Sequence, residues 1–122
     1  MSFEDLDVWK RSARLSADLY RVLCDCRDFG FKDQITRSAL SIASNIAEGY
    51  ERHSRKDRVK FLFYAKGSCG ELRTQIYIGM ETQFIDPETG KRWIGETHDL
   101  SRMLRGLSAR LADTSPTSRE TP

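Results

Sequence analysis

The chain has 122 residues, of which 39% are hydrophobic and 31% charged, and its formal net charge is +2. These values predict one globular domain that buries about two-thirds of the surface its unfolded chain would expose. A membrane-spanning or secreted protein is not expected, because no apolar run approaches the ~20 residues of a membrane span and no signal-peptide core is seen. Binding of nucleic acid through the overall field of the protein is not expected either, because the net charge is too low.

The first predicted helix follows Asp5, its expected N-cap, and reaches about Arg27. Its apolar residues fall on two different faces. One face carries Leu6, Trp9, Ala13, Ser16, Tyr20 and Leu23, and the other carries Val8, Leu15, Leu19, Val22 and Cys26. A helix in a small monomeric bundle needs one buried face, so the second face indicates a further partner surface.

The second helix is predicted over about Gln34 to Glu51, with Gly30 ending the helix before it and Asp33 as its N-cap. Alanines recur every four residues along it, at Ala39, Ala43 and Ala47. Such a row lets a neighbouring helix approach closely, because only methyl groups separate the two backbones.

The third helix is predicted from near Arg55 to about Gln83, because Ser54 and Asp57 fit the capping-box pattern. Its apolar stripe comprises Val59, Leu62, Phe63, Cys69, Leu72, Ile76 and Met80, broadened by Phe61, Ala65 and Tyr77. Gly67 and Gly70 interrupt it, and each mid-helix glycine costs ~1 kcal/mol relative to alanine. The pair indicates close contact with another helix, with a kink as the alternative.

The fourth helix is expected to begin between Pro87 and Lys91, since proline is tolerated only in the first turn. Its seam comprises Trp93, Thr97, Leu100, Leu104, Leu107 and Leu111. Four helices with short connections predict an all-α, antiparallel up-down-up-down four-helix bundle over residues 1–112. Residues 113–122 contain no apolar anchor and are predicted to form a disordered C-terminal tail.

The three cysteines, Cys24, Cys26 and Cys69, are an odd number within apolar helical patterns. We interpret them as reduced core thiols of a cytoplasmic protein. Cys24 and Cys26 are two residues apart on a helix, which points them about 200° apart and makes a poor metal pair.

Catalytic patterns are missing from the sequence. A di-iron bundle needs a Glu-x-x-His motif on each of two helices, but His53 falls in a turn and His98 follows Gly95 by three residues. No glycine-rich phosphate loop or nucleophile–base pair can be identified. The sequence therefore predicts a protein that is not an enzyme, with no catalytic residues, metal or cofactor.

Two carboxylates, Glu48 and Glu71, lie in mainly small or apolar helical surroundings. Paired carboxylates could perform acid–base catalysis. A helix-crossing hydrogen-bond network with Ser41 and Asn45 explains them better, since buried polar groups must find partners. We therefore predict a structural polar network of Ser41, Asn45, Glu48 and Glu71.

One local basic patch stands out. It comprises Arg52, Arg55, Lys56, Arg58 and Lys60 and is called the basic turn below. It lies at the start of the third helix, where exposed N–H groups and the helix dipole also favour an anion. We predict phosphate contacts with structured RNA and little base discrimination, because the nearby aromatic residues Tyr50, Phe61 and Tyr64 fit the core pattern. The alternative is an ordinary solvated helix end.

A second basic pair, Lys91 and Arg92, precedes the fourth helix. In an up-down-up-down bundle, the turn between helices two and three lies opposite the turn between helices three and four. The two basic segments are therefore expected at opposite ends.

Certain segments of the sequence are specific enough to compare with a known family. They are FEDLDVWK at residues 3–10, QITRSA at 34–39, SIASNIAEGY at 41–50 and GSCGELRTQ at 67–75. With them the chain, from about Phe3 to Leu111, resembles the 23S rRNA intervening-sequence family of four-helix-bundle proteins. It departs from the usual pattern at Gly70 and Arg73 and in lacking a proline before the second helix.

The resemblance implies a bacterial, cytoplasmic protein that forms a homopentamer around a central channel. It also implies binding to structured RNA or to a nucleic-acid enzyme, since a similar protein accompanies the reverse transcriptase of diversity-generating retroelements. Two functions stay open: an oligomeric RNA-binding accessory protein, and a homo-oligomeric scaffold that binds another protein without nucleic acid.

Overall fold

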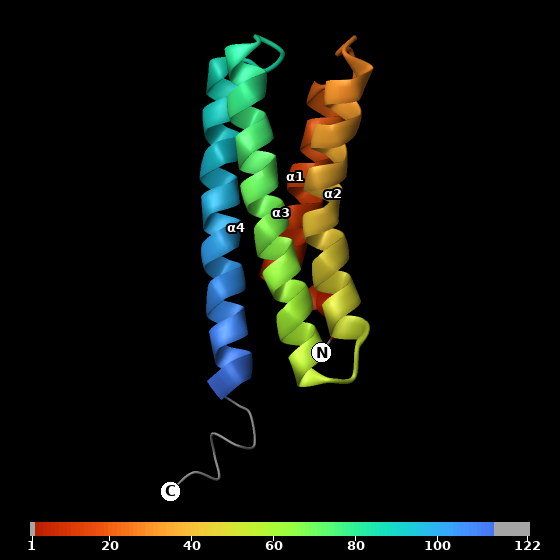
Figure 1. Cartoon of the computed structure of the whole chain (residues 1–122), viewed down its shortest axis with the longest axis vertical. Coiled ribbons are helices and arrows are strands. Elements are labelled where there is room, and N and C mark those ends of the chain that lie inside the picture. The colour runs from red at the N-terminus through yellow and green to blue at the C-terminus, as the bar shows by residue number, and fades with distance from the viewer. Residues whose placement is uncertain (1, 114–122) are drawn as a thin grey trace, which may run out of the picture.

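The computed structural model describes residues 2–113, which form four α-helices preceded by a short 3-10 turn, η1. The elements are η1 (Phe3–Asp5), α1 (Asp7–Val22), α2 (Phe29–Glu51), α3 (Arg55–Glu81) and α4 (Pro87–Asp113). Consecutive helices run in opposite directions (Figure 1), which confirms the predicted up-down-up-down bundle. Of the predicted tail, Asp113 is the last residue of α4 and residues 114–122 lie outside the described part.

The helices pack in the order α1, α2, α3, α4, and the bundle closes between α1 and α4 with the sparsest of the four helix–helix contacts. Its largest fully buried side chains are Trp93, Leu19, Leu23, Ile35, Ile42, Ile46, Leu62, Leu72, Ile76, Ile85, Leu100 and Leu104. Burying each such side chain stabilises the fold by about 1.5–3 kcal/mol. The core thus joins all four helices along their length.

Each of the two apolar faces predicted for the first helix is only partly buried. Val8, Leu15 and Leu19 of one face enter the core, but Val22 of the same face is 48% exposed. On the other face Leu23 is buried and Tyr20 is 50% exposed. On α3, Phe63 is 69% exposed, so its predicted place in the core stripe is wrong. One residue further along a helix rotates the side chain by about 100°, so a core position at Leu62 leaves Phe63 on the flank.

The first helix boundaries differ from the prediction. Asp5 lies in η1 and not at an N-cap position, and α1 ends five residues before Arg27. Asp28 caps α2, because its Oδ1 accepts a hydrogen bond from the Phe31 N–H at 3.0 Å. Gly30 is therefore inside α2, and Asp33 is not its cap. A capping carboxylate was available earlier in the chain, and it starts the helix there.

Later boundaries are close to the predicted ones. Ser54 caps α3 by accepting a hydrogen bond from the Asp57 N–H at 3.2 Å. Pro87 is the first residue of α4, and the Thr89 N–H donates to Asp86 Oδ2 at 3.1 Å. The turns between α2 and α3 and between α3 and α4 lie at opposite ends of the bundle (Figure 1), as expected for the two basic segments.

Candidate nucleic-acid interface

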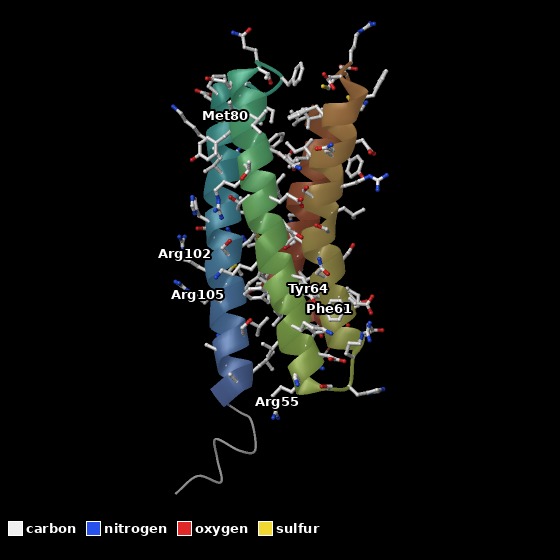
Figure 2. All side chains as sticks on the ribbon, viewed as in Figure 1. Arg55, Phe61, Tyr64, Met80, Arg102 and Arg105 are labelled. Carbon is white, nitrogen blue, oxygen red and sulfur yellow. The ribbon has the colours of Figure 1, made fainter. Side chains whose placement is uncertain are left out.

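The basic turn lies at the end of the bundle where α2 passes into α3 (Figure 1). Ser54 uses its side chain to cap α3, so the basic residues that follow occupy the first turns of a well-formed helix. Arg55 projects from this end (Figure 2). The geometry therefore combines positive side chains with the positive end of a helix dipole.

Two of the five basic residues form ion pairs within the chain. Arg52 Nε lies 3.2 Å from Glu48 Oε2, and Lys60 Nζ lies 3.9 Å from Asp57 Oδ1. Arg52 and Lys60 also lie near the Phe61 ring, 5.0 and 5.6 Å from its centroid. Part of their charge is therefore already committed, although both side chains remain exposed.

Arg58 is the least available of the set. Its guanidinium lies 4.4 Å from the centroid of the Tyr50 ring, and its buried Nε has no acceptor among the described residues. Burial raises the pKa of Tyr50, while the positive charges of Arg58 and Arg110 act to lower it by a smaller amount. This stack fastens the end of α2 to the start of α3 and leaves Arg58 facing inward.

Arg55 and Lys56 are the two exposed cations that remain. Neither side chain makes a hydrogen bond or ion pair within residues 2–113. They stand side by side in the first turn of α3. The basic turn therefore offers a phosphate two cations without partners. Arg52 and Lys60 could bind a phosphate only by giving up their ion pairs with Glu48 and Asp57.

The three nearby aromatic residues are not all in the core. Phe61 and Tyr50 are partly buried, whereas Tyr64 is 49% exposed. Phe61 packs edge-on against Tyr64, with 5.5 Å between ring centroids (Figure 2). The prediction that all three are core is wrong for Tyr64, which faces outward from α3.

Polar side chains link α2 to α3. Ser38 Oγ donates to Glu71 Oε1 at 3.2 Å, and Ser41 Oγ donates to Ser68 Oγ at 2.7 Å. Asn45 Nδ2 donates to the Ser41 carbonyl at 2.9 Å. Ser41 and Glu71 thus take part in hydrogen bonds between α2 and α3, and Ser38 and Ser68 are partners that were not predicted. The predicted place of Asn45 in this helix-crossing network is wrong, because its hydrogen bond stays within α2.

Glu48 does not join that seam. It is exposed and pairs with Arg52, one turn further along α2. The expected network that includes Glu48 is therefore corrected, because the three-residue step from Asn45 rotates the side chain about 60° away. An exposed i,i+4 pair of this kind contributes only about 0.3–0.5 kcal/mol.

The outward side of α3 carries an unusual stripe. Its members are Phe63, Gly67, Gly70, Thr74 and Tyr77, called the α3 outer face below. Phe63 and Tyr77 are 69% and 55% exposed, and a Cβ added at either glycine would meet no atom of the described chain within 4 Å. The expected close helix contact at these glycines is therefore not made within one chain.

A shallow groove of about 420 Å³ runs between α1 and α2 on another side of the bundle. It is lined by Phe3, Trp9, Ala13, Ser16, Ala17, Tyr20, Leu40, Ala43, Ser44 and Ala47, and is called the α1–α2 groove below. Six of its lining residues are alanine or serine and three are aromatic. The predicted alanine row of α2 thus lines a groove as well as the core.

No metal-binding group of three or more His, Cys, Asp or Glu side chains occurs within residues 2–113. Cys69 is fully buried, and burial raises the pKa of its thiol to about 11, so it stays protonated at neutral pH. Cys24 is exposed because α1 ends at Val22, which corrects the expectation that every thiol is in the core. None of the helices in this part of the chain is long and apolar enough to cross a membrane.

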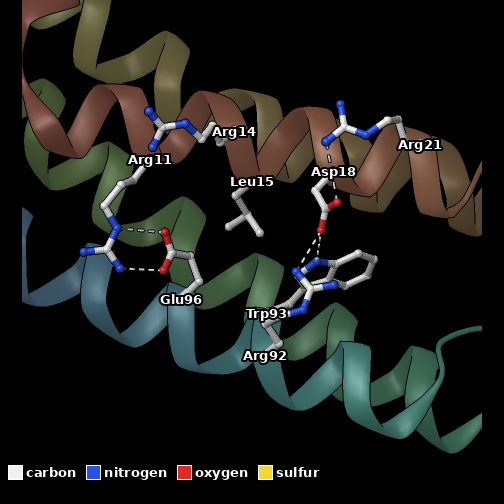
Figure 3. Close-up of a pocket in the computed structure, with 8 residues that line it drawn as sticks. All are labelled: Arg11, Arg14, Leu15, Asp18, Arg21, Arg92, Trp93 and Glu96. Atoms are coloured by element: carbon white, nitrogen blue, oxygen red, sulfur yellow. Dashed lines mark hydrogen bonds and ion pairs between the residues drawn. The ribbon is translucent and has the colours of Figure 1, made fainter.

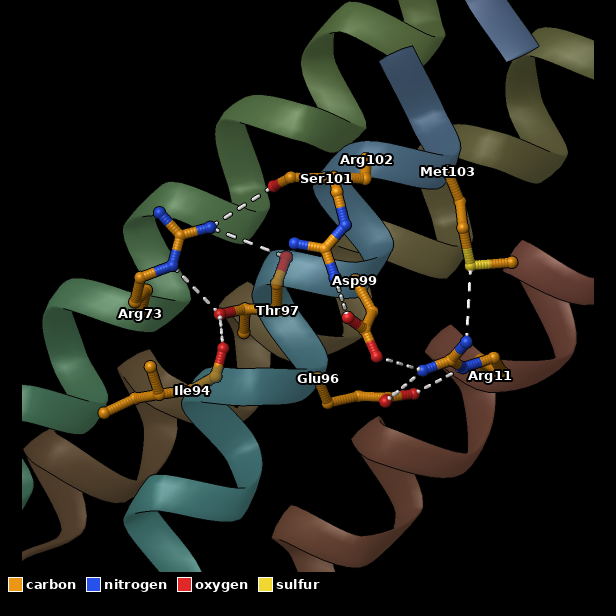
Figure 4. Close-up of polar contacts among 9 residues, drawn as sticks. All are labelled: Arg11, Arg73, Ile94, Glu96, Thr97, Asp99, Ser101, Arg102 and Met103. Carbon is orange, nitrogen blue, oxygen red and sulfur yellow. Dashed lines mark hydrogen bonds and ion pairs between the residues drawn. The ribbon is translucent and has the colours of Figure 1, made fainter. Parts of the chain in front are cut away.

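Polar contacts with α4 were not foreseen from the sequence. Arg11 on α1 donates to Glu96 Oε2 and to Asp99 Oδ2, each at 2.9 Å (Figure 4). These hydrogen bonds raise the pKa of Arg11. The partners are 85 and 88 residues apart, so no local sequence signal connects them.

Arg73 explains one departure from the family pattern. Its Nε donates to Thr97 Oγ1 at 3.0 Å and its Nη2 to Ser101 Oγ at 3.3 Å, which ties α3 to α4 (Figure 4). Thr97 is fully buried, so the arginine satisfies a hydroxyl inside the bundle. The positive charge at this position therefore has a structural use.

Comparison with known proteins identifies a family and a solved structure with a similar fold. The family model of the 23S rRNA-intervening sequence protein matches residues 4–106. A solved structure of a protein of unknown function from the S23 ribosomal protein family of Bacteroides thetaiotaomicron aligns with a TM-score of 0.77 and 23% identity, over 83% of this chain and 97% of that chain. At that identity the likeness shows a shared fold. No curated protein matches the sequence.

Proposed function

The chain belongs to the 23S rRNA-intervening sequence protein family, and on this premise we propose that it is a non-enzymatic, homo-oligomeric accessory protein that binds structured RNA through the basic turn. The observation that carries the proposal is the pair Arg55 and Lys56, exposed and unpaired within the described chain at the N-terminus of α3. An anion placed there meets two cations and a helix dipole together.

The chemistry of the basic turn favours phosphate over bases. Arginine and lysine bind phosphate oxygens through charge-assisted hydrogen bonds that carry no sequence information. Phe61 is poorly placed to stack on a base, because Arg52 and Lys60 lie near its ring. The ligand expected is therefore the sugar–phosphate backbone of a folded RNA.

The proposed assembly uses the two surfaces that one chain leaves uncovered. Exposed large apolar side chains on one helix face suit an interaction site, and the α3 outer face carries two of them, Phe63 and Tyr77. The glycines between them let another backbone come close. The α1–α2 groove offers small side chains to receive a helix. We place the α3 outer face of one copy in the α1–α2 groove of the next.

A contact between two different surfaces of the same chain is head-to-tail, and it produces a closed ring when its rotation closes. Five copies is the number that the family resemblance implies. A ring also repeats the basic turn around its axis. Weak phosphate contacts at several copies then add avidity without any new contact within one copy.

The test of RNA binding is a fluorescence anisotropy titration with a labelled RNA hairpin at several salt concentrations. Each phosphate contact should contribute roughly 0.7–0.9 to the slope of log K against log salt. The variant Arg55→Gln/Lys56→Gln should therefore bind every hairpin more weakly and lose about 1.4–1.8 from that slope for each copy that contacts the RNA.

A matched control is Arg27→Gln/Arg37→Gln, which removes the same charge from two exposed arginines away from the basic turn. It should bind RNA like the wild type. Equal affinity of both variants would remove the basic turn from the proposal, and no binding by the wild type even at low salt would end the RNA proposal.

The second candidate function is a scaffold that binds another protein without nucleic acid. The exposed side chains Phe63, Tyr64, Tyr77 and Ile78 on α3 favour it, because they suit a protein partner as well as a second copy. Copurification from native cells with and without nuclease separates the two. A partner retained after nuclease treatment, together with no RNA binding in vitro, would establish the scaffold.

A further inference from the structure

A polar cleft of about 490 Å³ opens between α1 and α4 (Figure 3), in the half of the bundle opposite the basic turn. Four arginines and two carboxylates line it: Arg11, Arg14, Arg21 and Arg92 against Asp18 and Glu96. It exists because α1 and α4 make the sparsest helix–helix contact of the bundle. The cleft shares no residue with the basic turn.

Both carboxylates are already committed within the chain. Glu96 forms a two-point pair with Arg11, with N–O distances of 2.9 and 2.5 Å. Asp18 Oδ2 accepts hydrogen bonds from the Trp93 indole Nε1 at 2.8 Å and from Arg92 Nη1 at 3.1 Å. The Trp93 hydrogen bond in particular holds the pKa of Asp18 below its usual value. Neither carboxylate therefore calls for an added cation.

Two of the arginines are not committed. Arg14 makes no side-chain hydrogen bond or ion pair within the described residues. Arg21 is 71% exposed, and its only ion pair there is a 3.6 Å contact with Asp18, which contributes little at such exposure. Arg14 and Arg21 are seven residues apart on α1, which places them on one face two turns from each other.

We propose that this cleft is a binding site for phosphate groups, held mainly by Arg14 and Arg21 with Arg92 from the opposite helix. Guanidinium groups match the geometry of phosphate oxygens and keep their charge at all relevant pH values. Trp93 is only 1% exposed, so it supports Asp18 and offers no face for a base. The site recognises the phosphate and not what the phosphate carries.

The cleft lies far from the basic turn, which bears on where its phosphate comes from. The 27 residues of α3 span about 40 Å, and Arg92 lies one turn and a half into α4, so the cleft is roughly 30 Å from the basic turn along the bundle. The phosphate can come from a long RNA that follows the bundle or from a small phosphorylated molecule. The inference stands on the cleft residues alone and does not require the basic turn to bind RNA.

The two tryptophans make the test specific. Trp93 reports on the cleft, and Trp9 lies in the α1–α2 groove. Their indole N–H signals are followed by NMR while the full chain is titrated separately with inorganic phosphate and with an RNA hairpin. We expect the Trp93 signal to shift and the Trp9 signal to stay. Arg14→Gln/Arg21→Gln should weaken the response about tenfold for each arginine removed, and Arg27→Gln/Arg37→Gln should leave it unchanged.

The outcomes separate this inference from the proposed function. A Trp93 shift with the hairpin that the cleft variant loses supports the site with RNA as the phosphate source. A shift with inorganic phosphate alone supports the site with a small ligand as the source. RNA binding without any Trp93 shift, or equal responses in both double variants, would overturn the cleft while leaving the basic turn intact.

Discussion

The variant Gly67→Ala/Gly70→Ala tests whether the α3 outer face is a helix–helix contact between copies. Within one chain, a Cβ at either position meets no described atom within 4 Å. Alanine should therefore only improve the helix, by ~1 kcal/mol at each position. In an isolated chain the pair would raise the melting temperature by roughly 8 °C, taking about 4 °C per kcal/mol for a domain of this size.

In an assembly the same two methyl groups would act in the opposite direction. If the neighbouring α1–α2 groove closes over these glycines, the added methyls overpack the contact at a cost of about 1–3 kcal/mol. Each 1.4 kcal/mol corresponds to about tenfold in a dissociation constant. We therefore expect a variant that is more stable as a monomer and weaker as an oligomer.

Light scattering and thermal melts over a dilution series measure both effects, because an oligomer melts at a temperature that depends on concentration. The control is Gly95→Ala on α4, another helical glycine with open space around it but outside the α3 outer face. It should stabilise the chain by ~1 kcal/mol without changing assembly. A wild type that is monomeric at micromolar concentration, or a double variant that assembles as tightly as the wild type, would show that the α3 outer face is not a contact between copies.

Further changes have equally definite expectations. Gly49→Ala should lower the free energy of unfolding by about 1–3 kcal/mol in urea denaturation, because the new Cβ would lie 2.9 Å from the Phe61 Cβ; unchanged stability would show that α2 and α3 can move apart. The lowered pKa of Asp18 means that the ionised form stabilises the fold above its unfolded pKa of about 4, and that this contribution is lost as pH falls through the lower folded pKa. Asp18→Asn should therefore be less stable than wild type at pH 7, with a difference that shrinks in acid; a difference independent of pH would contradict this assignment. An aromatic disulfide reagent at neutral pH should label Cys24 in the native protein and reach Cys69, whose pKa is raised to about 11, only after unfolding; equal labelling rates would contradict the burial of Cys69.

Local signals in the sequence were enough to place the elements where capping side chains or proline act at short range. Ser54 and Pro87 start α3 and α4 as expected, and the α2–α3 turn carries the basic residues. Near Asp28 the predicted cap, Asp33, is wrong, because an earlier carboxylate is available and caps the helix there. The family-specific segments predicted membership of the 23S rRNA-intervening sequence protein family, which the match over residues 4–106 confirms.

The candidate site was only partly predictable for a different reason. The sequence shows that five basic residues are close together, but not that Arg58 turns inward onto Tyr50 or that Arg52 and Lys60 have partners. These contacts depend on how the end of α2 meets the start of α3. The separation of two free cations from three engaged ones is a property of that junction.

The sequence by itself determined four helices, their alternating directions and the end at which the basic turn lies, because periodicity, caps and short connections are local. The tertiary structure decided how far each predicted apolar face is buried, since the rotation of a helix follows from the sum of its contacts with two neighbours. That rotation left Phe63 and Tyr77 outside, closed the core over Trp93, and brought Arg11 to Glu96 across 85 residues. It also left the cleft between α1 and α4, the pair of adjacent helices with the sparsest contacts.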